Sequence, residues 1–495
     1  MAFNWPFRWM RHLGLVVAAL LVWLPLTQVA PSQVLSGPVK RPNIVFILTD
    51  DLSMDLVQYM PQVRKMQQEG VTFTNYFVTD SLCCPSRASI FTGRFPHNTG
   101  VFKNTGADGG YRVFEARGNQ QATFATALQA AGYRTAMLGK YLNGYAPREN
   151  QADPGWTFWA VAGAAYKEFN YVLNEDRKIV RYGSEPKDYL TDVISGLAVD
   201  FIRRSAGTPF AIEIATFAPH APYIPAPRHA NQFQDLKAPR GPAFDAPPDP
   251  SAPKWLKAIP PLAQNTIALI DKYYRMRAQS VLAVDEMIGA LRAAVAAIGE
   301  QNNTYFVFSS DNGYHMGEHR LRPGKQTAFD TDIHVPLVIT GPGVQAGRTV
   351  DQIAMNVDLA PTFVELGGAT ALPDVDGRSL VPLLRGQAPA DWRTAALIEH
   401  KGPHADPSDP DMNDLYEHKG LSGNPTTYEA IRTQTAVYVE YADGEREYYN
   451  HVTDANELHN TFASLPESVK RSLHQTASAM KGCRGKMACA TAAHR

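Results

Sequence analysis

Residues 43–51 read NIVFILTDD, and this stretch decides the fold. Its first six residues are almost wholly apolar and several are β-branched, a pattern typical of a strand that is buried on both faces of a parallel sheet. The stretch ends in Asp50 and Asp51, at the point where open α/β sheets bind their ligands. Adjacent aspartates are also common in turns and helix caps, so other parts of the chain must distinguish the two uses.

The remaining pattern continues this α/β character. Strands are expected at 71–78, 210–217, 305–310 and 335–340, and helices at 121–131, 189–202 and 265–298. Residues 228–261 are rich in Pro, Asp and Ala and predict a long surface loop near a substrate entrance. A hairpin with an Asp-Gly turn at 436–449 and a last helix over about 466–480 follow. The prediction is a large, mostly parallel sheet sandwiched by helices, with a small C-terminal antiparallel α+β domain.

The 495-residue chain is divided into three parts. Residues 1–30 place positive charges before an uncharged run that is too short for a membrane span, which is the order of a secretory signal peptide. An uncleaved anchor is the alternative, because Gln28 is unfavourable two places before a cut after Ala30. Residues 40–388 are the expected catalytic domain and residues 389–495 the small domain. A secreted or periplasmic location follows, with no stable membrane contact unless the signal is retained.

Charge and cysteine content narrow the class of protein further. The chain has 47 basic and 48 acidic side chains, so nothing in the composition indicates a nucleic-acid partner. Cys483 and Cys489 lie close together near the C-terminus, where a disulfide is expected in an oxidising compartment. Cys83 and Cys84 are adjacent, and both are expected to lack a cysteine partner.

Residues 81–94 read SLCCPSRASIFTGR and combine a thiol, a proline and an arginine. Pro85 fits the first turn of a helix, because the N–H that proline lacks has no partner there. Cys83 therefore lies at the positive end of that helix, where a nucleophile or an anion is stabilised. Arg87, one turn further, can contact the same anion. A buried cysteine at the start of an ordinary helix is the alternative.

This string resembles the signature of the type I sulfatases, C-x-P-S-R followed by T-G-R, in which the first cysteine is oxidised to formylglycine. Further family motifs follow in order: Gly-Lys at 139–140, Pro-His-x-Pro at 219–222, and DNGYHMGEHRLRPGK at 311–325. The string GKYLN at 139–143 is similar to the branch of N-acetylglucosamine-6-sulfatases and endosulfatases. The resemblance covers roughly residues 40–480 and implies the fold of the alkaline phosphatase superfamily.

The resemblance also implies a set of site residues. Oxygen ligands suit one calcium ion better than zinc, and the implied ligands are Asp50, Asp51, oxidised Cys83, Asp311 and Asn312. The implied catalytic residues are the nucleophile from Cys83, the proton donor His220, and three cations for the sulfate oxygens: Arg87, Lys140 and Lys325. Many members carry a histidine base two residues after the lysine of Gly-Lys. Leu142 occupies that position here, and His315 is the candidate replacement.

These expectations combine into a sulfuric ester hydrolase that acts on a sulfated sugar like N-acetylglucosamine 6-sulfate, or on an aryl sulfate. A formylglycine-generating enzyme is the implied maturation partner. A phosphonate or phosphodiester hydrolase is an alternative, because that chemistry uses a similar metal and formylglycine frame. A catalytically silent glycan-binding protein, in which Cys83 is never oxidised, is another; it would not need a proton donor and a metal-bound nucleophile together.

Overall fold

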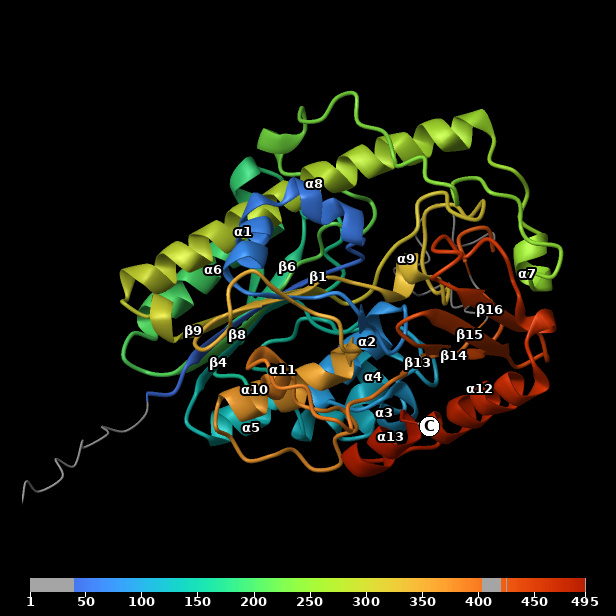
Figure 1. The fold of residues 1–495 in the computed structure, drawn as a ribbon. Helices are drawn as coiled ribbons and strands as arrows, with labels where there is room; N and C mark the ends of the chain where they lie inside the picture. Colours follow the sequence, from blue (N-terminus) through green and yellow to red (C-terminus); the bar gives the residue numbers. More distant parts are fainter. Residues whose placement is uncertain (1–39, 403–419, 424, 495) are drawn as a thin grey trace, which may run out of the picture. The chain divides into compact units, whose positions relative to one another are not determined.

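The central element is a ten-stranded sheet with the order β11-β2-β10-β9-β1-β8-β4-β5-β6-β7 (Figure 1). The computed structural model describes residues 40–402, 420–423 and 425–494, so the expected signal peptide lies outside the described residues. β1 (Asn43–Thr49) pairs in parallel with β8 (Phe210–Ala215) and with β9 (Thr304–Ser310). All of its residues are buried, as the apolar pattern predicts for a strand covered on both faces.

The outer strands complete this sheet and include antiparallel pairs. Beyond β8 lie β4 (Arg134–Lys140) and β5 (Phe158–Ala162), both parallel, and then β6 (Val172–Glu175) and β7 (Lys178–Arg181). Beyond β9 lie β10 (Leu337–Thr340), β2 (Val71–Phe73) and β11 (Arg348–Val350). The strand expected over 71–78 is interrupted, because β3 (Tyr76–Phe77) leaves the large sheet and pairs with β12 (Ala354–Met355).

Helices cover both faces of the large sheet (Figure 1). One face carries α1 (Pro61–Glu69), α6 (Leu190–Arg204) and α8 (Gln264–Ala297). The other face carries α2 (Cys83–Thr92), α5 (Phe124–Ala130) and α10 (Leu359–Leu366). Alternate β1 side chains enter the two apolar cores, with Val45 and Ile47 on the α8 side and Phe46 and Leu48 on the α2 side. The predicted sandwich is confirmed.

Short helical segments connect these elements. They are η1 (Met54–Tyr59), α3 (Pro96–Thr99), α4 (Gly110–Ala116), η2 (Asn119–Gln121), η3 (Pro186–Asp188), η4 (Pro227–His229), α7 (Lys254–Lys257), η5 (Gln301–Asn303), α9 (Asp330–Ile333), η6 (Asn356–Asp358), α11 (Val381–Leu384) and η9 (Phe462–Ser464). The segment expected as a long surface loop, 228–261, is largely irregular, and Ser251 within it exchanges two hydrogen bonds of 2.9 Å with Asn460. These contacts attach the segment to the C-terminal region.

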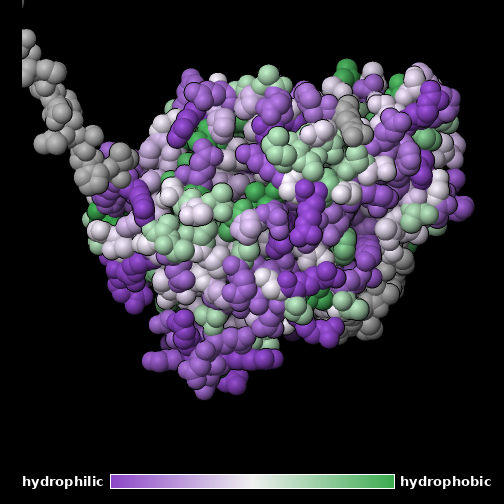
Figure 2. All heavy atoms as spheres, turned by 90° about the horizontal axis from the view of Figure 1, so that it is seen from below, coloured by the Kyte–Doolittle hydropathy of each residue, from purple (hydrophilic) through white to green (hydrophobic). Residues whose placement is uncertain are grey.

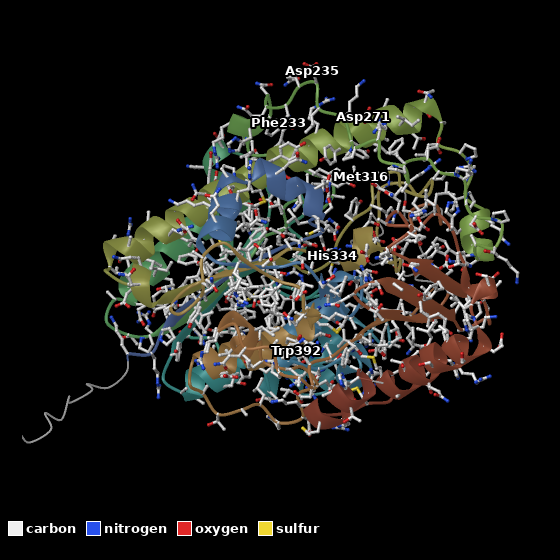
Figure 3. All side chains as sticks on the ribbon, in the orientation of Figure 1. Phe233, Asp235, Asp271, Met316, His334 and Trp392 are labelled. Carbon is white, nitrogen blue, oxygen red and sulfur yellow. A yellow bond between two sulfur atoms is a disulfide. The ribbon has the colours of Figure 1, made fainter. Side chains whose placement is uncertain are left out.

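The C-terminal region contains a four-stranded antiparallel sheet, as the hairpin signal predicts. Its strands are β13 (Ala396–His400), β14 (Tyr428–Arg432), β15 (Ala436–Tyr441) and β16 (Arg446–Asn450), and α12 (Glu467–Met480) and α13 (Lys486–Ala492) follow. The expected disulfide joins Cys483 to Cys489. Trp392, labelled in Figure 3, precedes this sheet and donates from its indole N–H to Ile353 O at 2.8 Å. The domain boundary near residue 388 stays a prediction.

The surface viewed in Figure 2 is mostly hydrophilic, with smaller apolar areas between the polar ones. The exposed large hydrophobic side chains among the described residues are few: Met54, Val452, Val469 and Met487. Isolated exposed side chains of this kind are ordinary for a folded protein. Among the described residues, no helix has the length and apolar character needed to cross a bilayer.

Candidate active site

Cys83 is the first residue of α2 and lies at the carboxyl edge of the large sheet. Leu82 before it is extended, with φ −141° and ψ 139°, and the chain turns into the helix directly at the thiol. Pro85 stands in the first turn, as expected. Gly93 ends the helix in the left-handed region at φ 70°, where a Cβ atom would lie 3.1 Å from Pro361. Every residue of α2 is buried, so the thiol is fixed in the interior.

Four oxygen-bearing side chains meet Cys83 because two parallel strands end side by side. Asp50 and Asp51 follow β1, Asp311 and Asn312 follow β9, and Thr49 and Ser310 are partners in the register of these strands. The Cys83 Sγ atom lies 3.3 Å from Asp50 Oδ1 and 3.9 Å from Asp51 Oδ1. All four polar side chains are completely buried. The structure thus brings together the residues that the sequence proposes as metal ligands.

Three cations stand among these acids. Lys140, at the end of β4, contacts Asp50 Oδ2, and Lys325 Nζ lies 2.8 Å from Asp51 Oδ1 and 2.9 Å from Cys83 Sγ. Arg87 Nε donates to Asp311 Oδ2 at 2.7 Å. We name the six charged residues around Cys83, together with Asn312, the Cys83 centre: Asp50, Asp51, Arg87, Lys140, Asp311 and Lys325.

The acids of the Cys83 centre differ in their electrostatics. Burial alone would raise the pKa of Asp50, but the charges of Lys140, His220 and Arg87 outweigh burial and hold that pKa well below its usual range. Burial and the neighbouring charge of Asp50 raise the pKa of Asp311 to about 6. These two acids of the Cys83 centre therefore differ in how strongly their surroundings stabilise the charged form, which is better stabilised at Asp50 than at Asp311.

The Cys83 centre fits a hard divalent cation. Within the described part of the chain, Asp51 Oδ2 and Asn312 Oδ1 are buried and accept no hydrogen bond. Buried acceptors without donors are unusual, and carboxylate and amide oxygens are the ligands that calcium prefers. The potential ligand atoms of Asp50, Asp51, Cys83 and His220 also lie within 4.8 Å of one another. Sequence reasoning did not include His220 in this group.

His220 lies in the loop after β8 with its ring orientation fixed. Its Nδ1 atom is 2.7 Å from Ala221 O, and because a carbonyl oxygen only accepts, Nδ1 carries a proton. Its Nε2 atom lies 3.5 Å from Asp51 Oδ2 and faces the Cys83 centre. The ring of Tyr166 lies 4.6 Å from the His220 ring, and Lys140 Nζ lies 4.9 Å from the Tyr166 ring centre. His220 is thus placed to exchange a proton at Nε2.

His315 has a different environment. Its Nδ1 atom lies 2.9 and 3.0 Å from the two carboxylate oxygens of Asp332, which also accepts from Thr327 N and Oγ1. Burial would lower the pKa of His315, but the charge of Asp332 outweighs burial and raises it. The raised pKa makes the His315 ring more basic than a free imidazole. The role of His315 as a base stays a prediction.

Sequence reasoning missed several contacts of the site. Asp332 orients His315, and Asn143 donates to Tyr166 Oη at 3.2 Å beside a cavity of about 100 Å³ that Lys140 also lines. Asn143 belongs to the quoted GKYLN string, and Tyr166 lies in residues 151–190, which are rich in aromatic side chains, so both carried a weak signal. Asp332 carried none, because only the folded loop places it against His315.

Comparison with known proteins decides the family. The profile described as Sulfatase matches residues 42–369, and one described as N-sulphoglucosamine sulphohydrolase, C-terminal, matches residues 317–481. The chain belongs to the sulfatase family. This sulfatase is 33% identical to the human N-acetylglucosamine-6-sulfatase over 90% of its own length and 85% of the relative's. It is 30% identical to the N-acetylglucosamine-6-O-sulfatase of Bacteroides thetaiotaomicron, over 87% and 84% of the two chains.

A solved structure supports the same assignment. A protein in complex with its substrate D-glucosamine-2-N,6-O-disulfate superimposes with a TM-score of 0.70 and 27% identity, covering 89% of this sulfatase and 97% of that chain. The similarity extends through the large sheet and the C-terminal region. The expected recognition as a sulfatase, and the expected fold, are therefore confirmed.

Proposed function

We propose that this sulfatase hydrolyses the sulfate ester of a sulfated sugar resembling N-acetylglucosamine 6-sulfate, with calcium bound at the Cys83 centre and formylglycine at residue 83. The observation that carries the proposal is the burial of three cations and three carboxylates around one thiol at a helix N-terminus. The relatives named as N-acetylglucosamine-6-sulfatases support the choice of sugar. A sulfate ester is anionic, and Arg87, Lys140 and Lys325 match its charge.

Oxidation of Cys83 to hydrated formylglycine would supply a hydroxyl nucleophile, whose pKa would be lowered by a calcium ion held by Asp50, Asp51, Asp311 and Asn312. Lys325 is 2.9 Å from the Cys83 sulfur, so it contacts both the nucleophile's position and the adjoining sulfate oxygens. Lys140 and Arg87 bind the remaining non-bridging oxygens. These cations neutralise charge as it develops on those oxygens, which lowers the barrier in a site without bulk water.

His220 protonates the leaving oxygen. As its S–O bond breaks, the leaving sugar oxygen takes the proton from Nε2, while Nδ1 stays bound to Ala221 O. The hydrogen bond at Nδ1 fixes the ring and aims Nε2 at the reacting atoms. His315 is proposed as the base that would take the proton from the remaining hydroxyl of residue 83 when sulfate is released. Asp332 holds its ring in place.

We also propose that the chain works outside the cytoplasm, after a formylglycine-generating enzyme has acted on Cys83. The disulfide between Cys483 and Cys489 supports an oxidising compartment. A relative from Drosophila melanogaster that is 35% identical over 73% of this chain is described as an extracellular sulfatase. The predicted signal peptide at residues 1–30 agrees with export.

The first experiment measures the mass of the peptide that contains residue 83, in protein purified from its native host and digested without hydride reduction. Formylglycine shows the mass loss expected for conversion of a thiol into an aldehyde. Sulfate release is then measured on N-acetylglucosamine 6-sulfate, its 3-sulfate isomer, an aryl sulfate and a phosphonate monoester. Preferred cleavage of the phosphonate contradicts the proposal, and sugar binding without turnover, with an intact thiol, indicates a glycan-binding protein.

A further inference from the structure

Arg277, in the helix α8, contacts two loops of the candidate active site. It lies in the middle of α8, after Asp271, which Figure 3 labels on that helix, and its side chain is completely buried. Its Nη2 atom donates to Asp51 O and, at 3.3 Å, to Ser53 Oγ, and its Nη1 atom donates to Pro219 O at 3.3 Å. One guanidinium therefore binds the backbone carbonyl of Asp51, a proposed metal ligand, and that of Pro219, the residue before the proposed proton donor His220.

The charge of Arg277 is not explained by an ion pair. Within residues 40–402, 420–423 and 425–494, its guanidinium forms no ion pair with a carboxylate. The rings of Tyr314 and Tyr223 lie 4.4 and 5.8 Å from its central carbon, and their hydroxyl oxygens are 2.7 Å apart. Burial of an unpaired charge is costly, and apolar side chains of similar volume fill such spaces at lower cost. The fixed donors of the guanidinium are the property that an apolar side chain lacks.

Asp51 is the residue that needs those donors. Its φ is 60°, in the left-handed region that residues other than glycine seldom adopt. Its carboxylate oxygen Oδ1 accepts from Asn312 Nδ2 at 2.6 Å and from Lys325 Nζ at 2.8 Å, so this backbone conformation directs the side chain into the Cys83 centre. Strained conformations persist where surrounding contacts over-determine them, and Arg277 supplies such a contact at the Asp51 carbonyl.

We propose that Arg277 is a positioning residue, which holds Asp51 in its left-handed conformation and the His220 loop in register with it. Calcium affinity and proton donation then both depend on a side chain that touches neither the metal nor the substrate. The proposal rests on the proposed function, because it assumes calcium at the Cys83 centre and a proton from His220. It adds a link between those two elements that the catalytic residues alone do not provide.

The test compares Arg277→Met with Arg292→Met. Arg292 lies in the same helix and pairs with Glu69, away from the site, so its variant loses the same charge from α8. Calcium binding to metal-free protein is measured by calorimetry, and kcat and KM are measured at saturating calcium. We expect Arg277→Met to bind calcium at least ~10-fold more weakly and to lose ~10²-fold in kcat with little change in KM. Arg292→Met keeps both values. Wild-type calcium affinity and kcat in folded Arg277→Met overturn the proposal.

Two further outcomes are distinguished. If Arg277→Met does not fold, Arg277→Lys is used, since one ammonium can reach one carbonyl but lacks the guanidinium fork; weaker calcium binding supports the proposal, and wild-type binding overturns it. If the wild-type enzyme turns over substrate without binding calcium, the metal in the proposed function is wrong. In that case kcat of the folded Arg277 variant decides: a loss of ~10²-fold supports the positioning role, and an unchanged value overturns it.

Discussion

The Cys83 centre and a second cluster near the C-terminal sheet use the same kinds of residues for different ends. The second cluster contains Asp330, Arg432, His451 and Glu457, and we name it the Asp330 clasp. Arg432 donates to both carboxylate oxygens of Asp330 at 2.8 and 2.9 Å. Glu457 accepts from Asp330 N at 3.0 Å, and its other oxygen lies 3.1 Å from His451 Nε2. Asp330, His451 and Glu457 are close enough together to suggest a metal site by proximity alone.

The two clusters differ in which polar atoms are satisfied. In the described residues, no buried side-chain oxygen or nitrogen of the Asp330 clasp lacks a hydrogen-bond partner, whereas Asp51 Oδ2, Asn312 Oδ1 and Arg87 Nη2 in the Cys83 centre do. A cluster whose polar atoms all have hydrogen-bond partners can serve to join two parts of the fold, whereas buried polar atoms without partners are available to bind a ligand. Whether the buried polar atoms have hydrogen-bond partners, rather than how close the side chains lie, distinguishes the Asp330 clasp from the Cys83 centre.

The largest effect is expected for Cys83→Ala, which removes the proposed nucleophile from the Cys83 centre. Sulfate release should fall by at least ~10⁴-fold, because the remaining cations bind a sulfate ester but have no group to attack it. The measurement is initial-rate sulfate release, with Cys84→Ala as the matched control at the neighbouring buried thiol. Turnover close to wild type in Cys83→Ala would show that the Cys83 centre is not the active site.

Asp51→Asn should cost about 10³-fold in kcat/KM, since it removes a charged oxygen from the proposed calcium site and a partner of Lys325. Calcium binding, measured by calorimetry, should weaken in parallel. Glu457→Gln in the Asp330 clasp is the control, and it should change neither value. If Glu457→Gln weakens calcium binding and Asp51→Asn does not, the functions of the two clusters are exchanged.

His220→Gln should lower kcat by about 10²–10⁴-fold on a sugar sulfate, because the sugar alkoxide is a poor leaving group without a proton. The loss should be much smaller, about 10-fold, on an aryl sulfate with an acidic phenol, which leaves without protonation. His459→Gln, at an exposed histidine, is the control. Equal losses on both substrates would assign His220 to binding of the sulfate or the metal.

Arg432→Met tests whether the Asp330 clasp stabilises the fold. It should lower the free energy of unfolding by about 2 kcal/mol, because Asp330 keeps its charge in a largely buried position without its bidentate partner. Denaturant unfolding measures the loss, and kcat at a temperature well below unfolding should stay within about twofold of wild type. A stable but inactive variant would give the Asp330 clasp a role in the reaction.

The smallest effect is expected at Asp80. This residue shows that buried polar atoms without hydrogen-bond partners do not always mark a functional site. Both of its carboxylate oxygens are buried without a hydrogen bond in the described residues, and burial followed by the charge of Glu399 raises its pKa well above the usual value. The folded state then keeps a proton that the unfolded state releases above pH 4, so stability falls as pH rises.

Asp80→Asn should remove this pH dependence and raise the free energy of unfolding by about 1 kcal/mol at pH 7, with the gain vanishing toward pH 4. Unfolding curves at several pH values provide the measurement, and activity should be unchanged. Loss of activity without a gain in stability would mean that the buried Asp80 carboxyl group helps to hold the active site in place.

The sequence predicts the large sheet well where strands are uninterrupted. The strands β1 and β9 are each seven residues long and rich in β-branched or aromatic side chains, which favours a buried strand over a buried helix. The expected strand at 71–78 is broken because Thr74 is exposed and bonds to Val350 O, which turns the chain out of the sheet before β3. A local pattern cannot show that partner, since it lies 276 positions away.

The candidate site likewise contains residues that a local sequence motif predicts and residues that only the folded chain reveals. Cys83, Arg87, Asp311 and Lys325 stand in motifs whose order carries their chemistry, so the sequence could name them. Arg277 stands in an ordinary helical pattern, and its contact with Asp51 spans 226 positions, so only the folded chain reveals it. Residues that act through another residue's backbone leave no spacing signal, whatever their importance.

Because α2 is completely buried, its first residue, Cys83, can be modified by another protein only before folding is complete. Cys83 has no exposed surface, and Lys325, 242 positions later, covers its sulfur. The oxidising enzyme proposed for maturation would therefore have to reach the thiol before the later half of the sheet closes over it. At a synthesis rate of ~5–20 residues per second, that interval lasts on the order of tens of seconds. Protein refolded with an unmodified thiol should stay inactive when the maturation enzyme is added afterwards, because the native fold keeps the sulfur out of reach of a protein-sized partner.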